Sequence, residues 1–105
     1  MIAVADLDTI SRARVDDAKI LLAAKRFDGA VYMCGYAIEI ALKARVCRTL
    51  GWNEFPMTQN EFKGLTNFKT HDLDLLLRLS GVEANIKQIH FLVWNAVAVW
   101  NPEAR

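Results

Sequence analysis

The chain has 105 residues, of which 53% are hydrophobic, and its 13 basic and 12 acidic residues leave a net charge of +1. With only two prolines and five glycines, this composition excludes collagen-like, low-complexity and wholly disordered chains. The near-neutral charge does not demand a nucleic acid or a membrane surface as a partner. The length predicts a single domain over residues 1–105.

No segment has the character of a signal peptide or a membrane span. The N-terminus lacks a basic start, and Asp6 and Asp8 interrupt its apolar residues. The longest apolar run, 91–100, is too short to cross about 30 Å of hydrocarbon. Cys34 and Cys47 would lie roughly 20 Å apart on one helix, too far for a disulfide. We therefore expect a soluble, cytoplasmic protein with two buried free thiols.

Apolar residues at helical spacing predict a first amphipathic helix over residues 4–26. Its stripe consists of Val4, Leu7, Ser11, Val15, Ala18 and Leu22. Gly29 is expected to end this helix or to form the turn that follows it. A second helix over residues 30–49 is apolar around nearly its whole circumference, which predicts burial on several sides. Gly51 is expected to end it.

Residues 51–70 form a long connection of mixed character. Its sequence from Thr58 to Glu61 has the pattern of a capping box, so a short helix is expected to begin there. Four aromatic residues indicate that this connection packs onto the rest of the domain, namely Trp52, Phe55, Phe62 and Phe68.

Two further helices follow. The third starts at Thr70 or Asp72 and ends at Ser80-Gly81, and the fourth runs from about residue 82 to 99. The fourth has an apolar stripe of Ile86, Ile89, Val93 and Val97, and Asn101-Pro102 stops it. No segment alternates with the period of a strand. The sequence therefore predicts an all-α fold, an antiparallel up-and-down bundle of four, or four to five, helices.

The familiar signatures of catalysis and of cofactor binding are absent. The sequence holds no P-loop, no GxGxxG pattern and no CxxC pair. His71 and His90 lie nineteen residues apart, without the spacing of zinc ligands. We predict no metal, no cofactor and no catalytic residue from these patterns.

One group of residues on the second helix stands out. Tyr32, Tyr36, Glu39 and Lys43 fall within about 60° of one another on a helical wheel. They form either a ligand or partner site in a groove, or a Glu–Lys pair on the one solvated face of the helix. We favour the second interpretation, because such surface pairs are weak evidence of function.

The histidines and the basic residues also allow two interpretations each. His71-Asp72 is either a general base or ligand contact, or a helix cap with a local hydrogen bond, which we favour. His90 precedes Trp94 by one helical turn, and we expect it to pack between helices. The basic residues Lys43, Arg45 and Arg48 could contact phosphate, but a solvated face is the default.

Three segments resemble motifs of one family, in the order in which that family has them. Residues 26–44, RFDGAVYMCGYAIEIALKA, resemble the second-helix signature of HEPN domains, Gly-Tyr-x-x-Glu-x-x-Leu-Lys. Residues 69–77, KTHDLDLLL, resemble the His-[Asp/Asn]-Leu segment that opens a later helix. Residues 100–105, WNPEAR, look like the segment before the closing helix of the family, which this chain is expected to lack.

The resemblance implies a helical bundle that is often a homodimer, in a family of divided function. Some members are metal-independent ribonucleases of toxin or defence type, while others pair with minimal nucleotidyltransferases in toxin–antitoxin modules or were proposed to bind nucleotides. The ribonucleases carry an Arg-x(4–6)-His motif, and neither His71 nor His90 has an arginine at that spacing. Glu39 and Lys43 match the polar positions of the second helix, and His71 and Asp72 match the His-Asp pair.

From these residues and this resemblance we expect a non-catalytic HEPN-like module. It would form a homodimer with the second or fourth helix near the interface. It would bind a minimal nucleotidyltransferase, a nucleotide or RNA near Tyr32, Tyr36, Glu39, Lys43, His71 and Asp72. The first alternative is a metal-independent HEPN ribonuclease of toxin or defence type. The second is a structural assembly helix pair without a ligand.

Overall fold

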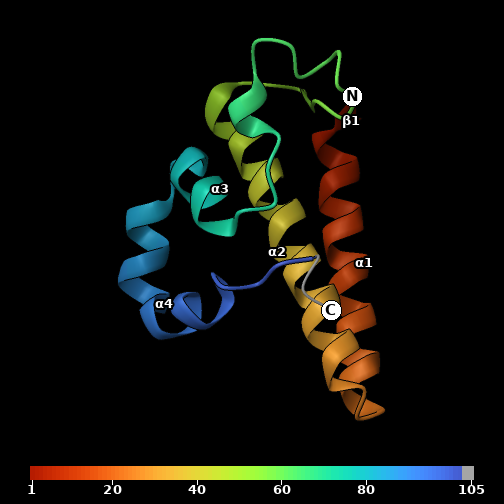
Figure 1. Ribbon diagram of the computed structural model, residues 1–105. Coiled ribbons are helices and arrows are strands. Elements are labelled where there is room, and N and C mark those ends of the chain that lie inside the picture. Colours follow the sequence, from red (N-terminus) through yellow and green to blue (C-terminus); the bar gives the residue numbers. More distant parts are fainter. Residues whose placement is uncertain (103–105) are drawn as a thin grey trace.

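The computed structural model describes residues 1–102, which form four helices. They are α1 (Val4–Ala23), α2 (Phe27–Leu50), α3 (Leu73–Ser80) and α4 (Glu83–Val97). In Figure 1, α1 and α2 form a long antiparallel hairpin, and α3 and α4 lie on the side of α2 away from α1. The predicted all-α class is confirmed. The expectation about the end of the chain, at Arg105, lies outside the described residues.

The α1–α2 hairpin begins with the predicted apolar stripe and then departs from it. Leu7 and Ser11 are buried, and the Ser11 hydroxyl donates a 2.8 Å hydrogen bond to the carbonyl of Ala37 on α2. This bond explains how a serine occupies a core position, since a buried hydroxyl needs a partner. Val15 and Leu22 are exposed. The stripe fails there because Arg14 and Leu21, each one position earlier in the chain, are less exposed than Val15 and Leu22, which corresponds to a repeat slightly shorter than 3.6 residues.

The turn between α1 and α2 lies earlier than the sequence suggests. Lys25 adopts a left-handed conformation with φ 61°, and the amide of Arg26 donates to the carbonyl of Leu21 at 2.8 Å. These backbone bonds end α1, so Gly29 is neither a helix stop nor a turn but lies inside α2. A β-carbon at Gly29 would come within 3.3 Å of the Leu21 side chain, a tight contact that a small movement of this flexible side chain would relieve.

Helix α2 is buried on several sides, as predicted. Its buried residues include Ala30, Ala37, Leu42, Ala44, Val46 and Cys47. Gly51 ends the helix with φ 72°, and the amide of Trp52 donates to the carbonyl of Cys47 at 2.8 Å. Both cysteines are free, but only Cys47 is buried, and burial raises the pKa of its thiol. Cys34 is exposed, so the prediction of two buried thiols is wrong for it.

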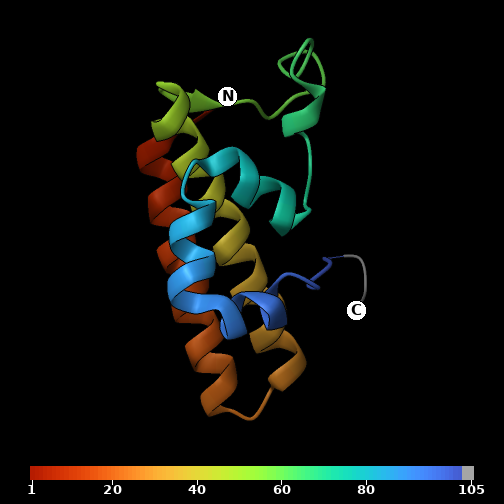
Figure 2. The ribbon, with the colours of Figure 1, turned by 90° about the vertical axis from the view of Figure 1, so that its left-hand side faces the viewer.

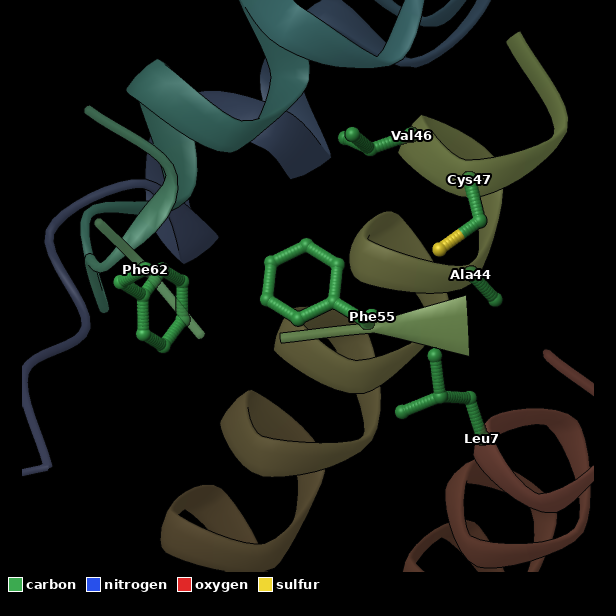
Figure 3. Packing of buried hydrophobic residues seen from close by; sticks show 6 residues of the cluster. All are labelled: Leu7, Ala44, Val46, Cys47, Phe55 and Phe62. Carbon is green, nitrogen blue, oxygen red and sulfur yellow. The ribbon is translucent and has the colours of Figure 1, made fainter. Parts of the chain in front are cut away.

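The connection after α2 covers one end of the hairpin. Phe55 and Phe62 are buried against Leu7 of α1 and the last turns of α2, as Figure 3 shows. Trp52 and Phe68 pack against the same cluster, with ring centroids 5.0 Å apart. The prediction that this aromatic segment packs onto the domain is confirmed.

Two local features of this connection differ from the prediction. Thr58 and Glu61 form the reciprocal bonds of a capping box, at 3.0 and 3.2 Å, but the predicted short helix is absent, because residues 59–64 form only turns. A short 3-10 helix, Thr66–Phe68, follows instead. The strands β1 (Ile2–Ala3) and β2 (Glu54–Phe55) pair antiparallel, which the sequence did not predict. Two residues per strand are too few to show an alternating pattern.

Helix α3 packs its leucines onto α2, as predicted. The Asp72 side chain accepts from the amide of Leu75 at 3.2 Å and so caps the helix, and Gly81 ends it with φ 81°. Leu73, Leu76 and Leu77 are fully buried in a second cluster that also contains Leu42 and Trp94. The fold therefore has two small cores, one where the connection covers the end of the α1–α2 hairpin and one between α2, α3 and α4.

Helix α4 departs most from its predicted stripe. His90 has non-helical angles, φ −123° and ψ 32°, which kink the helix at its middle. Trp94 is buried and donates a 2.8 Å hydrogen bond to Asp74 of α3, whereas Ile89 and Val93 are exposed. The kink turns the second half of the helix, so the predicted stripe does not stay on one side. His90 itself is exposed, and the expectation that it packs between helices is wrong.

The exposed side of α4 is unusually apolar. Ile89, Phe91, Leu92 and Val93, here called the α4 face, have exposed fractions between 58% and 81%. Figure 2, turned by 90°, shows α4 in front of the hairpin, on the outside of the domain. Within residues 1–102, no helix combines the length and the hydropathy that crossing a bilayer requires.

Candidate functional site

The second helix places Glu39 and Lys43 one turn apart on one face, where their side chains meet. The Lys43 ammonium lies 2.9 Å from Oε2 of Glu39. Glu39 is only 3% exposed and Lys43 only 17%, so this pair is not on a solvated face. That interpretation, which the sequence favoured, is wrong for Glu39. α3 and the residues before it cover this part of α2. The sequence of the second helix alone does not predict that another segment covers it.

His71 completes the group from a distant part of the chain. It precedes α3, and its Nδ1 lies 2.8 Å from Oε1 of Glu39. The carboxylate of Glu39 therefore has a cationic partner on one oxygen and an imidazole on the other. We call Glu39, Lys43 and His71 the Glu39 cluster. A buried carboxylate needs such partners, because burying an unpaired charge is costly.

The Glu39 cluster fixes the orientation of the His71 ring. A carboxylate paired with lysine accepts hydrogen bonds and donates none, so Nδ1 of His71 carries the proton in this contact. The other ring nitrogen, Nε2, is left for another group, and the His71 side chain is 55% exposed. A carboxylate that orients a histidine while its second nitrogen stays accessible is an arrangement that serves proton transfer or ligand binding.

Asp72 and Lys43 also make contacts that stabilise the fold. Asp72 caps α3 through its side chain, which confirms the favoured interpretation of this residue. Lys43 lies 5.4 Å from the centre of the Phe55 ring, so the ammonium contacts an aromatic face as well as Glu39. The local hydrogen bond expected for His71 is instead a contact across 32 positions of sequence.

The two tyrosines of the predicted stripe lie in a different group. Tyr32 and Tyr36 pack edge to face, with ring centroids 4.9 Å apart, and Trp100 packs on Tyr36 at 5.3 Å. We call these three residues the aromatic cluster. The sequence does not predict Trp100 as part of a site, although it predicts that Asn101-Pro102, directly after it, stops the fourth helix. The indole rests on Gly35, where a β-carbon would lie only 2.1 Å from it.

The basic residues of α2 do not form one patch. Lys43 is held by Glu39, and Arg48 pairs with Asp8 of α1, a contact that raises the pKa of its guanidinium. Arg45 is exposed. In the part of the chain that the structure describes, no group of three or more metal-binding side chains comes together.

Comparison with models of known families identifies this chain's family. A family model described as the HEPN domain matches residues 4–95, which include α1, α2, α3 and most of α4. The matched region contains the whole Glu39 cluster, whereas Trp100 lies beyond it. No curated protein and no solved structure matches the chain.

Proposed function

Because the chain belongs to the HEPN domain family, we propose that it is a HEPN module that acts by binding and not by catalysis. In this proposal it forms a homodimer through α4. It also binds a minimal nucleotidyltransferase, or a nucleotide or RNA, at the Glu39 cluster with Asp72 beside it. The two tyrosines of the aromatic cluster, Tyr32 and Tyr36, would border the same binding region.

The α4 face is the observation that carries the proposal. Its side chains are apolar, and Leu92 is 81% exposed. Several large apolar side chains exposed close together on one helix favour a contact with another protein. The nearby charges, Glu83 and Lys87, pair with each other at 3.2 Å, so two copies that meet along α4 would suffer no net repulsion there.

A charge placed on the α4 face tests the dimer. We expect the purified protein to be a dimer by light scattering at micromolar concentration and the variant Leu92→Glu to be a monomer, because a carboxylate would be buried without a partner. Ile20→Glu is the matched control, since Ile20 is 68% exposed on α1, and it should remain a dimer. A monomeric wild type would refute the dimer, and dissociation by Ile20→Glu alone would place the interface elsewhere.

The Glu39 cluster supports the second part of the proposal. The His71 side chain is more than half exposed, and its Nδ1 contacts the buried carboxylate of Glu39. His71 can therefore contact a partner without losing its bond to Glu39. We expect His71→Ala to abolish capture of the nucleotidyltransferase partner or of the nucleotide, while His90→Ala does not. His90 is also an exposed histidine, but it lies at the kink of α4 and makes no contact with Glu39. Equal effects of the two variants would refute the assignment.

The same geometry favours one alternative, a metal-independent ribonuclease. His71 with Nδ1 held by Glu39 is arranged as a general base is, although the chain lacks an arginine at the family's nuclease spacing. This alternative predicts RNA cleavage in the presence of a chelator, lost in His71→Ala and retained in His90→Ala. A protein that leaves diverse RNAs intact would exclude it.

A further inference from the structure

A cavity of about 950 Å³ lies between the first half of α2 and the end of α4. None of the residues of the Glu39 cluster lines it. Its size suits a small molecule, since ligand sites in proteins measure about 300–1,000 Å³. It is therefore a second candidate site, which shares Tyr32 with the binding region proposed above but none of the residues of the Glu39 cluster.

Aromatic rings form part of the wall of this cavity. Tyr32 and Trp100 both line it, with ring centroids 6.3 Å apart and planes inclined by 53°. Trp100 is held in place by its seat on Gly35 and by its contact with Tyr36. The faces of such rings carry partial negative charge and attract cations.

The described residues of the lining carry charge of one sign. Among the described residues that line the cavity, Asp28 is acidic and none is lysine, arginine or histidine. Most of the remaining wall is apolar, formed by side chains such as Val31, Ile38 and Val97. Among these described residues, an anion would meet only the Asp28 carboxylate, whereas a cation would be attracted by both the carboxylate and the aromatic rings.

From this complementarity we propose that the cavity binds a small organic ammonium ion with an apolar body. The cationic head would lie against Asp28 and the ring faces of Tyr32 and Trp100. The apolar body would pack against Val31 and Val97. An apolar wall with a few polar groups that orient the ligand is the usual composition of a small-molecule site.

Choline and its uncharged isostere dimethylbutanol, in which carbon replaces the nitrogen, test this proposal directly. The two probes have the same shape, so their difference measures the recognition of charge. Isothermal titration of the intact protein should show choline binding about tenfold more tightly than dimethylbutanol. Equal binding of the two probes, or no binding of choline, would overturn the proposal.

Variants identify the residues responsible. We expect Asp28→Asn to weaken choline binding by about threefold or more, and Tyr32→Leu to do the same, while Tyr32→Phe retains binding because it keeps the ring. Asp16→Asn removes an exposed carboxylate of α1 outside the cavity and should change nothing. Equal weakening by Asp16→Asn and Asp28→Asn would show attraction by overall charge and would overturn the site.

Discussion

The contact between Gly35 and Trp100 makes the sharpest prediction about stability. A β-carbon at position 35 would lie 2.1 Å from both Cε2 and Nε1 of the indole. Carbon atoms that are not bonded meet at about 3.5 Å or more, so in Gly35→Ala the indole must move by roughly 1.4 Å or leave its seat. Either response disturbs the packing of Trp100 on Tyr36.

The size of the effect follows from two opposing terms. Forcing an extra methyl group into a packed contact costs about 1–3 kcal/mol. Replacing glycine by alanine inside a helix contributes about 1 kcal/mol in the other direction. We expect Gly35→Ala to lower the free energy of unfolding by up to about 2 kcal/mol, the difference between these two terms. For a domain of this length, each 1 kcal/mol corresponds to a decrease in Tm of about 4–8 °C.

Gly29→Ala is the matched control, because it is the same change in the same helix. Its β-carbon would come within 3.3 Å of Cδ1 of Leu21, which lies at the end of a flexible side chain. We expect this variant to be as stable as the wild type or up to about 1 kcal/mol more stable. Urea denaturation followed by far-UV circular dichroism measures both variants.

A double-mutant cycle with Trp100→Ala shows whether the indole is the cause. Without the indole, position 35 has room for a methyl group, so Gly35→Ala should stabilise the Trp100→Ala protein instead of destabilising it. If Gly35→Ala is as stable as Gly29→Ala, or if its effect is the same with and without Trp100, the reasoning is refuted.

Three further predictions concern the polar contacts. Asp72→Ala should lower the free energy of unfolding by about 1 kcal/mol, because α3 loses its cap. Asp72→Asn should keep most of the stability that the cap provides, and thermal unfolding measures both variants. Glu39→Ala should lower the free energy of unfolding by about 2 kcal/mol or more, because it leaves Lys43 largely buried without its carboxylate partner. His71→Ala should lower it by less than about 1 kcal/mol, because the His71 side chain is more than half exposed. The hydrogen bond from the Met1 α-ammonium lowers the pKa of Glu61 from 4.5 to about 2. The contact between Met1 and Glu61 therefore stabilises the fold above pH 4.5, and this stabilisation is lost as the pH falls toward 2.

These three predictions have clear contrary outcomes. Equal losses in Asp72→Ala and Asp72→Asn would mean that the cap does not stabilise α3. A Glu39→Ala protein as stable as the wild type would show that the Glu39–Lys43 pair is solvated in solution. Acid titration of Glu61→Gln should show less dependence of stability on pH between 4.5 and 2 than the wild type, and an unchanged profile would contradict the contact with Met1.

The sequence predicted those elements whose cause is local. Asp72 and Gly81 mark the ends of α3 because a cap and a left-handed glycine act within a few residues of chain. Gly51 ends α2 for the same reason. The four helices and the HEPN resemblance followed from patterns of this kind, and the match over residues 4–95 confirms the family.

The candidate site was predicted only in its parts. Glu39 and Lys43 were grouped because positions four apart share a helix face, and the structure brings His71 to the same carboxylate from 32 residues away. Which side chain completes a site depends on how α3 docks onto α2, and no local pattern encodes that docking. The separation of Tyr32 and Tyr36 from Glu39, into a cluster with Trp100, depends on the path of the chain after α4.

The sequence by itself determined the helices, their caps, the free cysteines and the family, because each depends on residues a few positions apart or on a motif read along the chain. Only the tertiary structure decided that Glu39 is buried, that α4 kinks at His90 and exposes Leu92, and that Trp100 rests on Gly35. Burial and contact depend on which surfaces meet when the helices pack, and that is a property of the whole chain and not of any one segment.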